Sequence, residues 1–132
     1  MTPQVSDTQI QRLAEHIARW FDGPLKVVTF DGESFGRIIS MSTWAGNDVY
    51  LAYRDGWITK NDTAGTPPWS QYSWDRIPAP EGPQGAVTAV VHALDAYFAE
   101  IGPLTHRFGF GNDPTTERLN ELRGIHSVEL GE

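Results

Sequence analysis

The sequence predicts an α+β fold in which an antiparallel β-meander of about five to six strands is packed by an N-terminal helix and a second helix, with a short C-terminal helix. Two segments place apolar residues at helical spacing, and the region between them alternates apolar and polar residues. Turn signals separate the alternating segments, and tight turns join antiparallel neighbours because parallel strands need a long crossover. The length of 132 residues suits a single domain spanning residues 1–132.

The first helix is expected to begin at a cap formed by Ser6 or Asp7. The apolar stripe that follows consists of Ile10, Leu13, Ala14, Ile17, Ala18 and Phe21. Gly23 and Pro24 then supply a stop signal, since neither residue supports a continuing helix.

The β-meander is predicted to follow this helix. Its expected strands are Leu25–Phe30, Phe35–Trp44, Val49–Arg54, Trp57–Lys60 and Trp69–Trp74. Asp31 with Gly32 is a turn signal, and Asp55 with Gly56 is typical of a two-residue hairpin.

The second half of the chain is predicted to contain two helices and one more strand. A helix over Gln84–Ile101 would bury a stripe of Val87, Val90, Val91, Leu94, Phe98 and Ile101. Leu104–Phe110 is the expected last strand, and Asn112 or Asp113 is expected to cap a short helix with Pro114 at its first position. The tail from Gly124 is expected to be either a frayed end or an edge strand.

Composition restricts the classes of function. The absence of cysteine excludes disulfides, thiolate metal sites and cysteine nucleophiles. The net charge of −7 disfavours direct nucleic-acid binding and suits a basic protein partner, although it also serves solubility alone. No secretory signal and no membrane-spanning apolar run is evident, so a cytoplasmic location without membrane contact is expected.

Motifs for catalysis are not evident. The four histidines lack metal-ligand spacing, and neither a G-x-S-x-G element nor a phosphate-binding loop occurs. The glycines in Phe108–Asp113 are expected to form a turn before a helix. The sequence therefore predicts a protein that is not an enzyme, with no catalytic residues, no metal site and no cofactor.

Aromatic residues gather in the middle of the chain. Trp44, Tyr50, Tyr53, Trp57, Trp69, Tyr72 and Trp74 lie in one stretch, with aspartates between them. Trp and Tyr are favoured at protein interfaces because they combine a large apolar area with a polar atom. The alternative is that these rings fill one face of the sheet, since aromatic residues also favour strands.

A run of short motifs extends from Val49 onward and comprises Val49-Tyr50-Leu51, Asp55-Gly56-Trp57, Tyr72-Ser73-Trp74, Ile77-Pro78, Ala93–Phe98, Gly102-Pro103 and Leu104–Phe110. The order of these features resembles that of the Imm1-type immunity proteins of bacterial polymorphic toxin systems. It covers about half of the chain, and Phe108 and Phe110 stand in the last strand where the family has a Trp. The resemblance implies a protein that binds a cognate toxin domain, often a nuclease or deaminase, and blocks its active site.

The leading hypothesis is thus a toxin-neutralising immunity protein. Its rings are expected to anchor the complex while its carboxylates pair with Lys or Arg of the toxin. The expected contact residues are Asp55, Trp57, Asp62, Trp69, Tyr72, Trp74, Asp75 and Glu81.

Three other hypotheses stay open. A small-ligand-binding domain would line a pocket with the aromatic cluster. A hydrolase or transferase would need polar groups converging in one cleft. A phage or accessory structural protein would use the aromatic surface in assembly and self-associate. The oligomeric state is not determined by the sequence.

Overall fold

The computed structural model describes residues 4–21, 25–32, 36–42, 48–62, 74–101, 114–125 and 127–131. The elements in chain order are α1 (Asp7–Trp20), β1 (Lys26–Asp31), β2 (Arg37–Ser42), β3 (Asp48–Tyr53), β4 (Trp57–Asp62), β5 (Asp75–Arg76), the 3-10 turn η3 (Pro83–Gly85), α2 (Ala86–Ile101) and α4 (Pro114–Leu122). The predicted combination of an N-terminal helix, an antiparallel sheet and later helices is confirmed.

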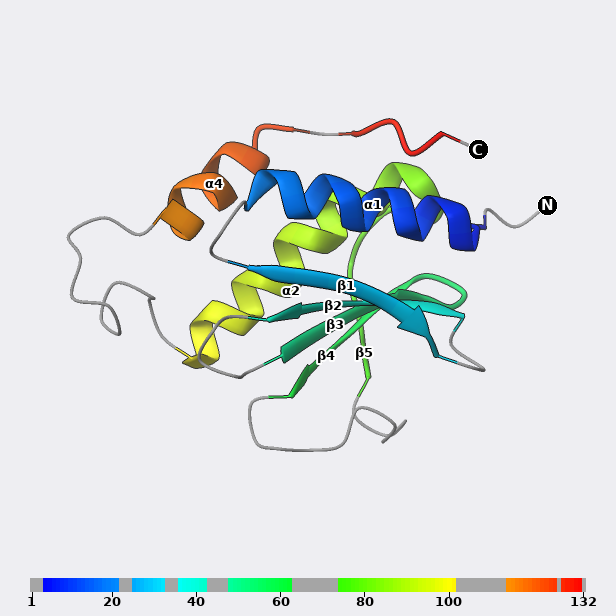
Figure 1. The fold of residues 1–132 in the computed structure, drawn as a ribbon, viewed down its shortest axis with the longest axis horizontal. Helices are drawn as coiled ribbons and strands as arrows, with labels where there is room; N and C mark the ends of the chain where they lie inside the picture. Colours follow the sequence, from blue (N-terminus) through cyan, green and yellow to red (C-terminus); the bar gives the residue numbers. More distant parts are fainter. Residues whose placement is uncertain are drawn as a thin grey trace.

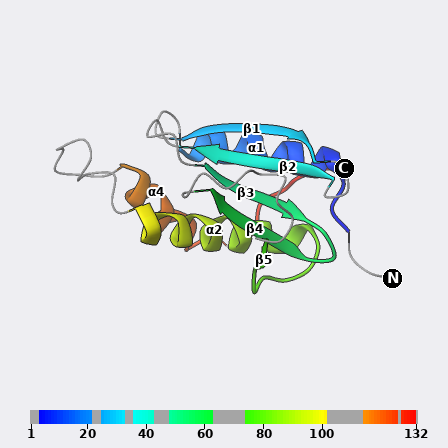
Figure 2. The same ribbon diagram turned by 90° about the horizontal axis from the view of Figure 1, so that it is seen from below.

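The sheet is a meander of five described strands in the order β1-β2-β3-β4-β5, and each neighbouring pair is antiparallel. α1 contacts β1 and β2, and α2 contacts β3 and β4. Both helices contribute to one hydrophobic cluster on the same face of the sheet. Figures 1 and 2 show this arrangement, with β1 and β5 at opposite edges.

Helix α1 begins at a capping box. The Ser6 hydroxyl accepts a hydrogen bond from the Gln9 backbone N–H at 3.1 Å, and the Ser6 backbone N–H donates to Gln9 Oε1 at 3.0 Å. Ser6 is therefore the cap, and Asp7 is the first helical residue. The predicted stripe is buried except for Ala18, which is exposed.

The two faces of the sheet follow the period of a β-strand. Ile39, Met41, Val49 and Leu51 point towards the helices and join the main cluster. We call this side the helix face. The opposite side, the outer face, holds a second cluster formed by Ile38, Tyr50, Ala52 and Ile58, with Trp74 packed against it.

The β3–β4 hairpin differs from the predicted two-residue turn. Tyr53 pairs with Trp57, which leaves Arg54, Asp55 and Gly56 between the paired positions. The two-residue turn would have paired Arg54 with Trp57 and turned Trp57 to the outer face. The observed register instead places Trp57 beside Tyr53 on the helix face, because a shift of one residue moves a side chain to the other side of a sheet.

The predicted strand Trp69–Trp74 is also corrected where it is described. The pairing with β4 involves Asp75 and Arg76, just after the predicted end, while residues 69–73 lie outside the described residues. The predicted strand Leu104–Phe110 and the predicted caps Asn112 and Asp113 lie outside them as well.

The described tail, residues 127–131, forms no strand and packs along α1 (Figure 1). Leu130 is buried in the main cluster. Gln9 Nε2 donates a hydrogen bond to the carbonyl of Gly131 at 3.2 Å, and His16 Nε2 lies 3.2 Å from the carbonyl of Glu129. Neither the predicted edge strand nor a frayed end describes this segment.

None of the described helices combines the length and apolar character needed to cross a membrane.

Candidate protein-binding surface

The loop between β3 and β4 is fastened to β5 by one side chain. Arg76 Nη1 donates hydrogen bonds to the carbonyls of Asp55, at 2.6 Å, and Arg54, at 3.4 Å. Asp55 adopts a φ of 55° and Gly56 a φ of 128°, values that disfavour most side chains. A Cβ added to Gly56 would lie 2.7 Å from Arg76 Nη1, so glycine also leaves room for the guanidinium. Asp55 is thus presented on a braced loop.

Trp57 does not belong to the contact surface, and this predicted site residue is wrong. Its side chain is 1% exposed, because the pairing of Tyr53 with Trp57 turns it into the main cluster. Trp57 Nε1 donates to the carbonyl of Gly82 at 3.1 Å, and the Gly82 N–H donates to the Tyr53 hydroxyl at 2.9 Å. The two rings meet edge to face at 5.1 Å. Trp57 and Tyr53 therefore hold the chain at Gly82.

One further hydrogen bond holds the segment between β5 and α2 against the sheet, and one close approach lies within the segment. The N–H of Ile77 donates to the carbonyl of Trp57 at 2.9 Å. Gly85 lies so close to this segment that an added Cβ would stand 1.9 Å from the carbonyl oxygen of Pro80. The backbone around Glu81 is consequently fixed at both ends.

Three predicted contact residues are exposed carboxylates on these braced segments. Asp55 lies in the β3–β4 loop, Asp75 lies in β5, and Glu81 directly precedes Gly82. Arg54 and Arg76 are exposed in the same region, and the Arg76 guanidinium is engaged by loop carbonyls. The region combines exposed carboxylates with a hydrogen-bonded backbone.

The other predicted contact residues divide into three cases. Trp74 is half-buried on the outer face. Asp62 ends β4, but its side chain is outside the described part of the structure. Trp69 and Tyr72 lie outside the described residues. Asp55, Asp75 and Glu81 thus lie on connected elements with exposed side chains. For Trp74, Asp62, Trp69 and Tyr72, the contact role stays a prediction.

An aromatic row crosses the outer face from β5 towards β1. The rings of Trp74 and Tyr50 are 6.4 Å apart, and those of Tyr50 and Phe30 are 6.2 Å apart and edge to face. Tyr50 itself is 5% exposed, so the accessible ends of this row are Trp74 and Phe30. The members of the aromatic cluster divide between the two faces, with Tyr53 and Trp57 on the helix face and Tyr50 and Trp74 on the outer face, because alternate residues of a strand occupy different faces.

Sequence analysis missed two features of the outer face. Lys60 pairs with Tyr50 and is buried, although its type favours exposure. Val28 and Phe30 are exposed on β1. The apolar run in β1 was visible in the sequence, but its position at the sheet edge depends on strand order.

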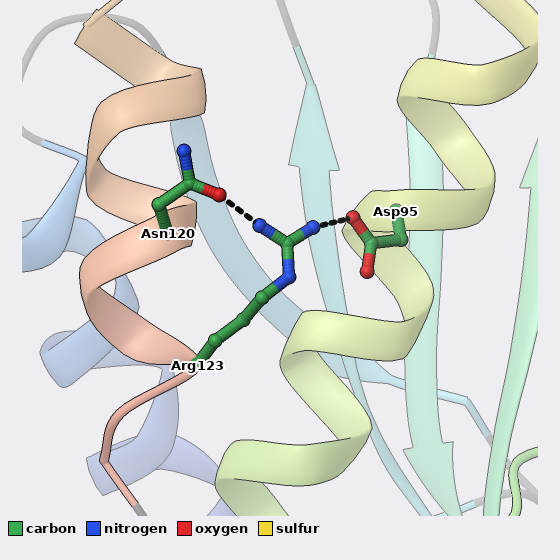
Figure 3. A network of polar contacts seen from close by, with 3 residues as sticks. All are labelled: Asp95, Asn120 and Arg123. Carbon is green, nitrogen blue, oxygen red and sulfur yellow. Dashed lines mark hydrogen bonds and ion pairs between the residues drawn. The ribbon is translucent and has the colours of Figure 1, made fainter.

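A shallow cavity of about 280 Å³ lies between α2 and α4. Its lining combines apolar and polar side chains and consists of Val87, Thr88, Val91, His92, Asp95, Leu122, Arg123 and Ile125. The Arg123 guanidinium joins the two helices by contacting Asp95 of α2 and Asn120 of α4 (Figure 3).

Within the described ranges, no group of three or more His, Cys, Asp or Glu side chains is placed to hold a metal ion. His16 stacks on Trp20 at 5.7 Å between ring centroids and lies 3.1 Å from Arg19 Nη2. This ring joins α1 to the tail through Glu129. His92 is exposed at the cavity, and His106 and His126 lie outside the described residues.

Comparisons with known proteins find no matching family model, no matching curated protein and no matching solved structure.

Proposed function

We propose that this protein is an immunity protein that binds a cognate bacterial toxin domain and inhibits it by covering its active site. It acts stoichiometrically in the cytoplasm, by binding and without catalysis. The observation that supports this proposal is the set of exposed carboxylates of Asp55, Asp75 and Glu81 on backbone braced by Arg76, Trp57 and Tyr53.

Bracing matters because ordering a loop during association costs binding free energy. A loop that is already held loses less conformational freedom when a partner binds. The exposed carboxylates on this held backbone then pair with Lys or Arg side chains, and the net charge of −7 attracts a basic partner over longer range.

The choice of a toxin as partner rests on the sequence resemblance together with charge. Enzymes that act on nucleic acid carry basic clefts that attract phosphate. An acidic surface with a half-exposed ring such as Trp74 is complementary to such a cleft. A nuclease or deaminase domain is therefore the partner class that the proposal favours.

The first experiment co-expresses this protein with the products of the genes that neighbour its own. One product is expected to be toxic alone, to be neutralised by this protein and to form a one-to-one complex by light scattering. If every neighbouring product were harmless alone, or if none bound, the immunity function would be wrong.

The contact assignment is tested by the double variant Asp55→Asn/Asp75→Asn in that complex. Removing two interface charges is expected to slow association about tenfold at low salt and to weaken its salt dependence. The matched control Glu15→Gln/Glu117→Gln removes two exposed charges from α1 and α4. Equal association rates for the two double variants would contradict the contact assignment.

The α2–α4 cavity favours a second candidate function, the binding of a small ligand. Its lining combines apolar and polar side chains, as ligand sites do, and its volume of about 280 Å³ lies just below their usual range. A fragment screen by NMR is expected to shift Val91 and Ile125 together if this function is correct. The absence of any fragment that shifts both residues would contradict it.

A further inference from the structure

The α2–α4 cavity is lined by apolar side chains and by an ion pair, which differ in their depth of burial. Val87 and Leu122 are each 2% exposed, whereas the side chains of Asp95 and Arg123 are 47% and 43% exposed. The apolar part of the lining is therefore more deeply buried than its charged part. A molecule that fits this lining has an apolar body and a polar edge, with the edge turned towards Asp95 and Arg123.

The ion pair restricts the charge of such a molecule. Arg123 Nη2 donates a hydrogen bond to Asp95 Oδ1, and Arg123 Nη1 donates to Asn120 Oδ1 (Figure 3). The two opposite charges offset each other, so an anion would meet the Asp95 carboxylate and a cation would meet the Arg123 guanidinium. A charged group would also lose water on entering the cavity, which costs free energy. The lining therefore favours a neutral molecule.

The same ion pair keeps unused hydrogen-bonding groups. Among the described residues, Asp95 is contacted through Oδ1, which leaves Oδ2 as an acceptor. The Arg123 guanidinium has five N–H donors, and its contacts to Asp95 and Asn120 engage two of them. An acceptor and several donors thus lie side by side in the lining. Thr88 and His92 line the same cavity and can each donate or accept a hydrogen bond.

A cyclic amide is complementary to this arrangement of groups. Its N–H can donate to a carboxylate while its C=O accepts from a guanidinium, and hydrogen bonds to charged groups are the stronger kind. In an open-chain secondary amide, the trans geometry turns the N–H and the C=O to opposite sides. A ring holds both groups on one edge, so that they reach Asp95 and Arg123 at the same time.

The volume of the cavity limits the size of the molecule. A volume of about 280 Å³ corresponds to about nine waters, since each occupies ~30 Å³ in the liquid. A bicyclic molecule of about ten non-hydrogen atoms has a similar volume. Its apolar ring would cover Val87 and Leu122, together with part of Ile125, which is 38% exposed.

We propose that the α2–α4 cavity binds a compact, neutral cyclic amide. The amide N–H donates to Asp95 Oδ2, the amide carbonyl accepts from the Arg123 guanidinium, and the apolar ring lies against Val87 and Leu122. This inference rests on the small-ligand function proposed above and names the class of ligand for that site. It is independent of the immunity function.

An NMR titration with oxindole, a bicyclic amide of this size, tests the proposal. Oxindole is expected to bind with a dissociation constant on the order of 1 mM and to shift the backbone amides of Val91 and Ile125 together. N-methyloxindole lacks the N–H, so it is expected to bind at least about tenfold more weakly. Equal affinities for the two compounds would overturn the amide-edge assignment and leave the small-ligand function standing.

Two charged compounds test the preference for a neutral molecule. Benzoate and benzylammonium are each expected to bind at least about tenfold more weakly than oxindole, because each meets one like charge in the lining. Equal or tighter binding of either ion would overturn this preference. If oxindole at about 10 mM shifted neither Val91 nor Ile125, the ligand class would be wrong. The small-ligand function would be wrong as well only if no fragment shifted these two residues.

The variant Asp95→Ala separates the contribution of the polar edge from that of the apolar lining. It removes the acceptor of the amide N–H, so the variant is expected to bind oxindole and N-methyloxindole within about twofold of each other. The matched control Glu117→Ala removes an exposed carboxylate of α4 that does not line the cavity, and it is expected to keep the preference for oxindole. An unchanged preference in Asp95→Ala would overturn the role assigned to Asp95.

Discussion

Both faces of the sheet are buried at their centre, but the cluster on the helix face contains many more residues than the cluster on the outer face. On the helix face, one cluster joins α1, the inner strands, α2, α4 and the tail. On the outer face, four buried residues form a small cluster, and exposure increases towards Val28 and Phe30 of β1. Alternate residues of the same strands therefore serve a continuous core on one side and a partly open surface on the other.

The two faces also differ in the polarity of their side chains. Leu51 and Met41 on the helix face are aliphatic or thioether side chains without a strong polar group. Tyr50, Lys60 and Trp74 on the outer face each carry a polar atom, and the Tyr50 hydroxyl donates a hydrogen bond to Asp48 Oδ2 at 3.3 Å. The outer face therefore mixes polar and apolar side chains at its centre, whereas the two central side chains named on the helix face are apolar.

The largest expected difference between the faces concerns their tryptophans. Trp57→Ala is expected to lower the free energy of unfolding by about 3–5 kcal/mol, because it leaves a cavity in the main cluster. The outer-face change Trp74→Ala removes a half-buried ring and is expected to cost about 1–2 kcal/mol. Urea unfolding measures both values. Equal losses in the free energy of unfolding would contradict the expected difference between the faces.

Neighbouring isoleucines in β2 give a matched pair with a smaller difference. Ile39→Ala removes a side chain from the main cluster and is expected to cost about 3–4 kcal/mol. Ile38→Ala affects the four-residue outer cluster and is expected to cost about 2 kcal/mol, since a small cluster can relax more easily. The same unfolding experiment compares them, and a larger loss for Ile38→Ala would reverse the ranking of the two clusters.

The smallest expected effect is at the sheet edge. Val27 packs against the main cluster, so Val27→Thr places a hydroxyl near apolar groups and is expected to cost about 1 kcal/mol. Val28→Thr at the exposed neighbour is expected to change the free energy of unfolding by less than about 0.5 kcal/mol. Thermal unfolding measures both changes. Equal changes in the free energy of unfolding would contradict the expected difference between the helix face and the outer face at β1.

Much of the fold was predictable because its signals are local. The helix cap expected at Ser6 or Asp7, the alternating strands and the Pro114 helix start each depend on residues a few positions apart. The exposed carboxylates of Asp55 and Glu81 were also predictable, since both residues lie among turn residues, whereas Asp75 directly follows the predicted strand Trp69–Trp74.

The position of Trp57 was not predictable from the same signals. Asp55 and Gly56 indicate a turn, but the turn is compatible with two registers that differ by one residue. The register that buries the Trp57 ring is selected by two long-range contacts: the packing of the ring in the main cluster and its hydrogen bond to the Gly82 carbonyl.

By itself, the sequence determined the class of fold, the antiparallel order of neighbouring strands and the acidic character of the surface, because each follows from spacing, turn composition or charge. The tertiary structure alone decided that Trp57 is buried, that Val28 and Phe30 lie on an open edge, and that the tail docks on α1. These outcomes depend on contacts between residues far apart in the chain, whose free energies are realised only when the layers pack together.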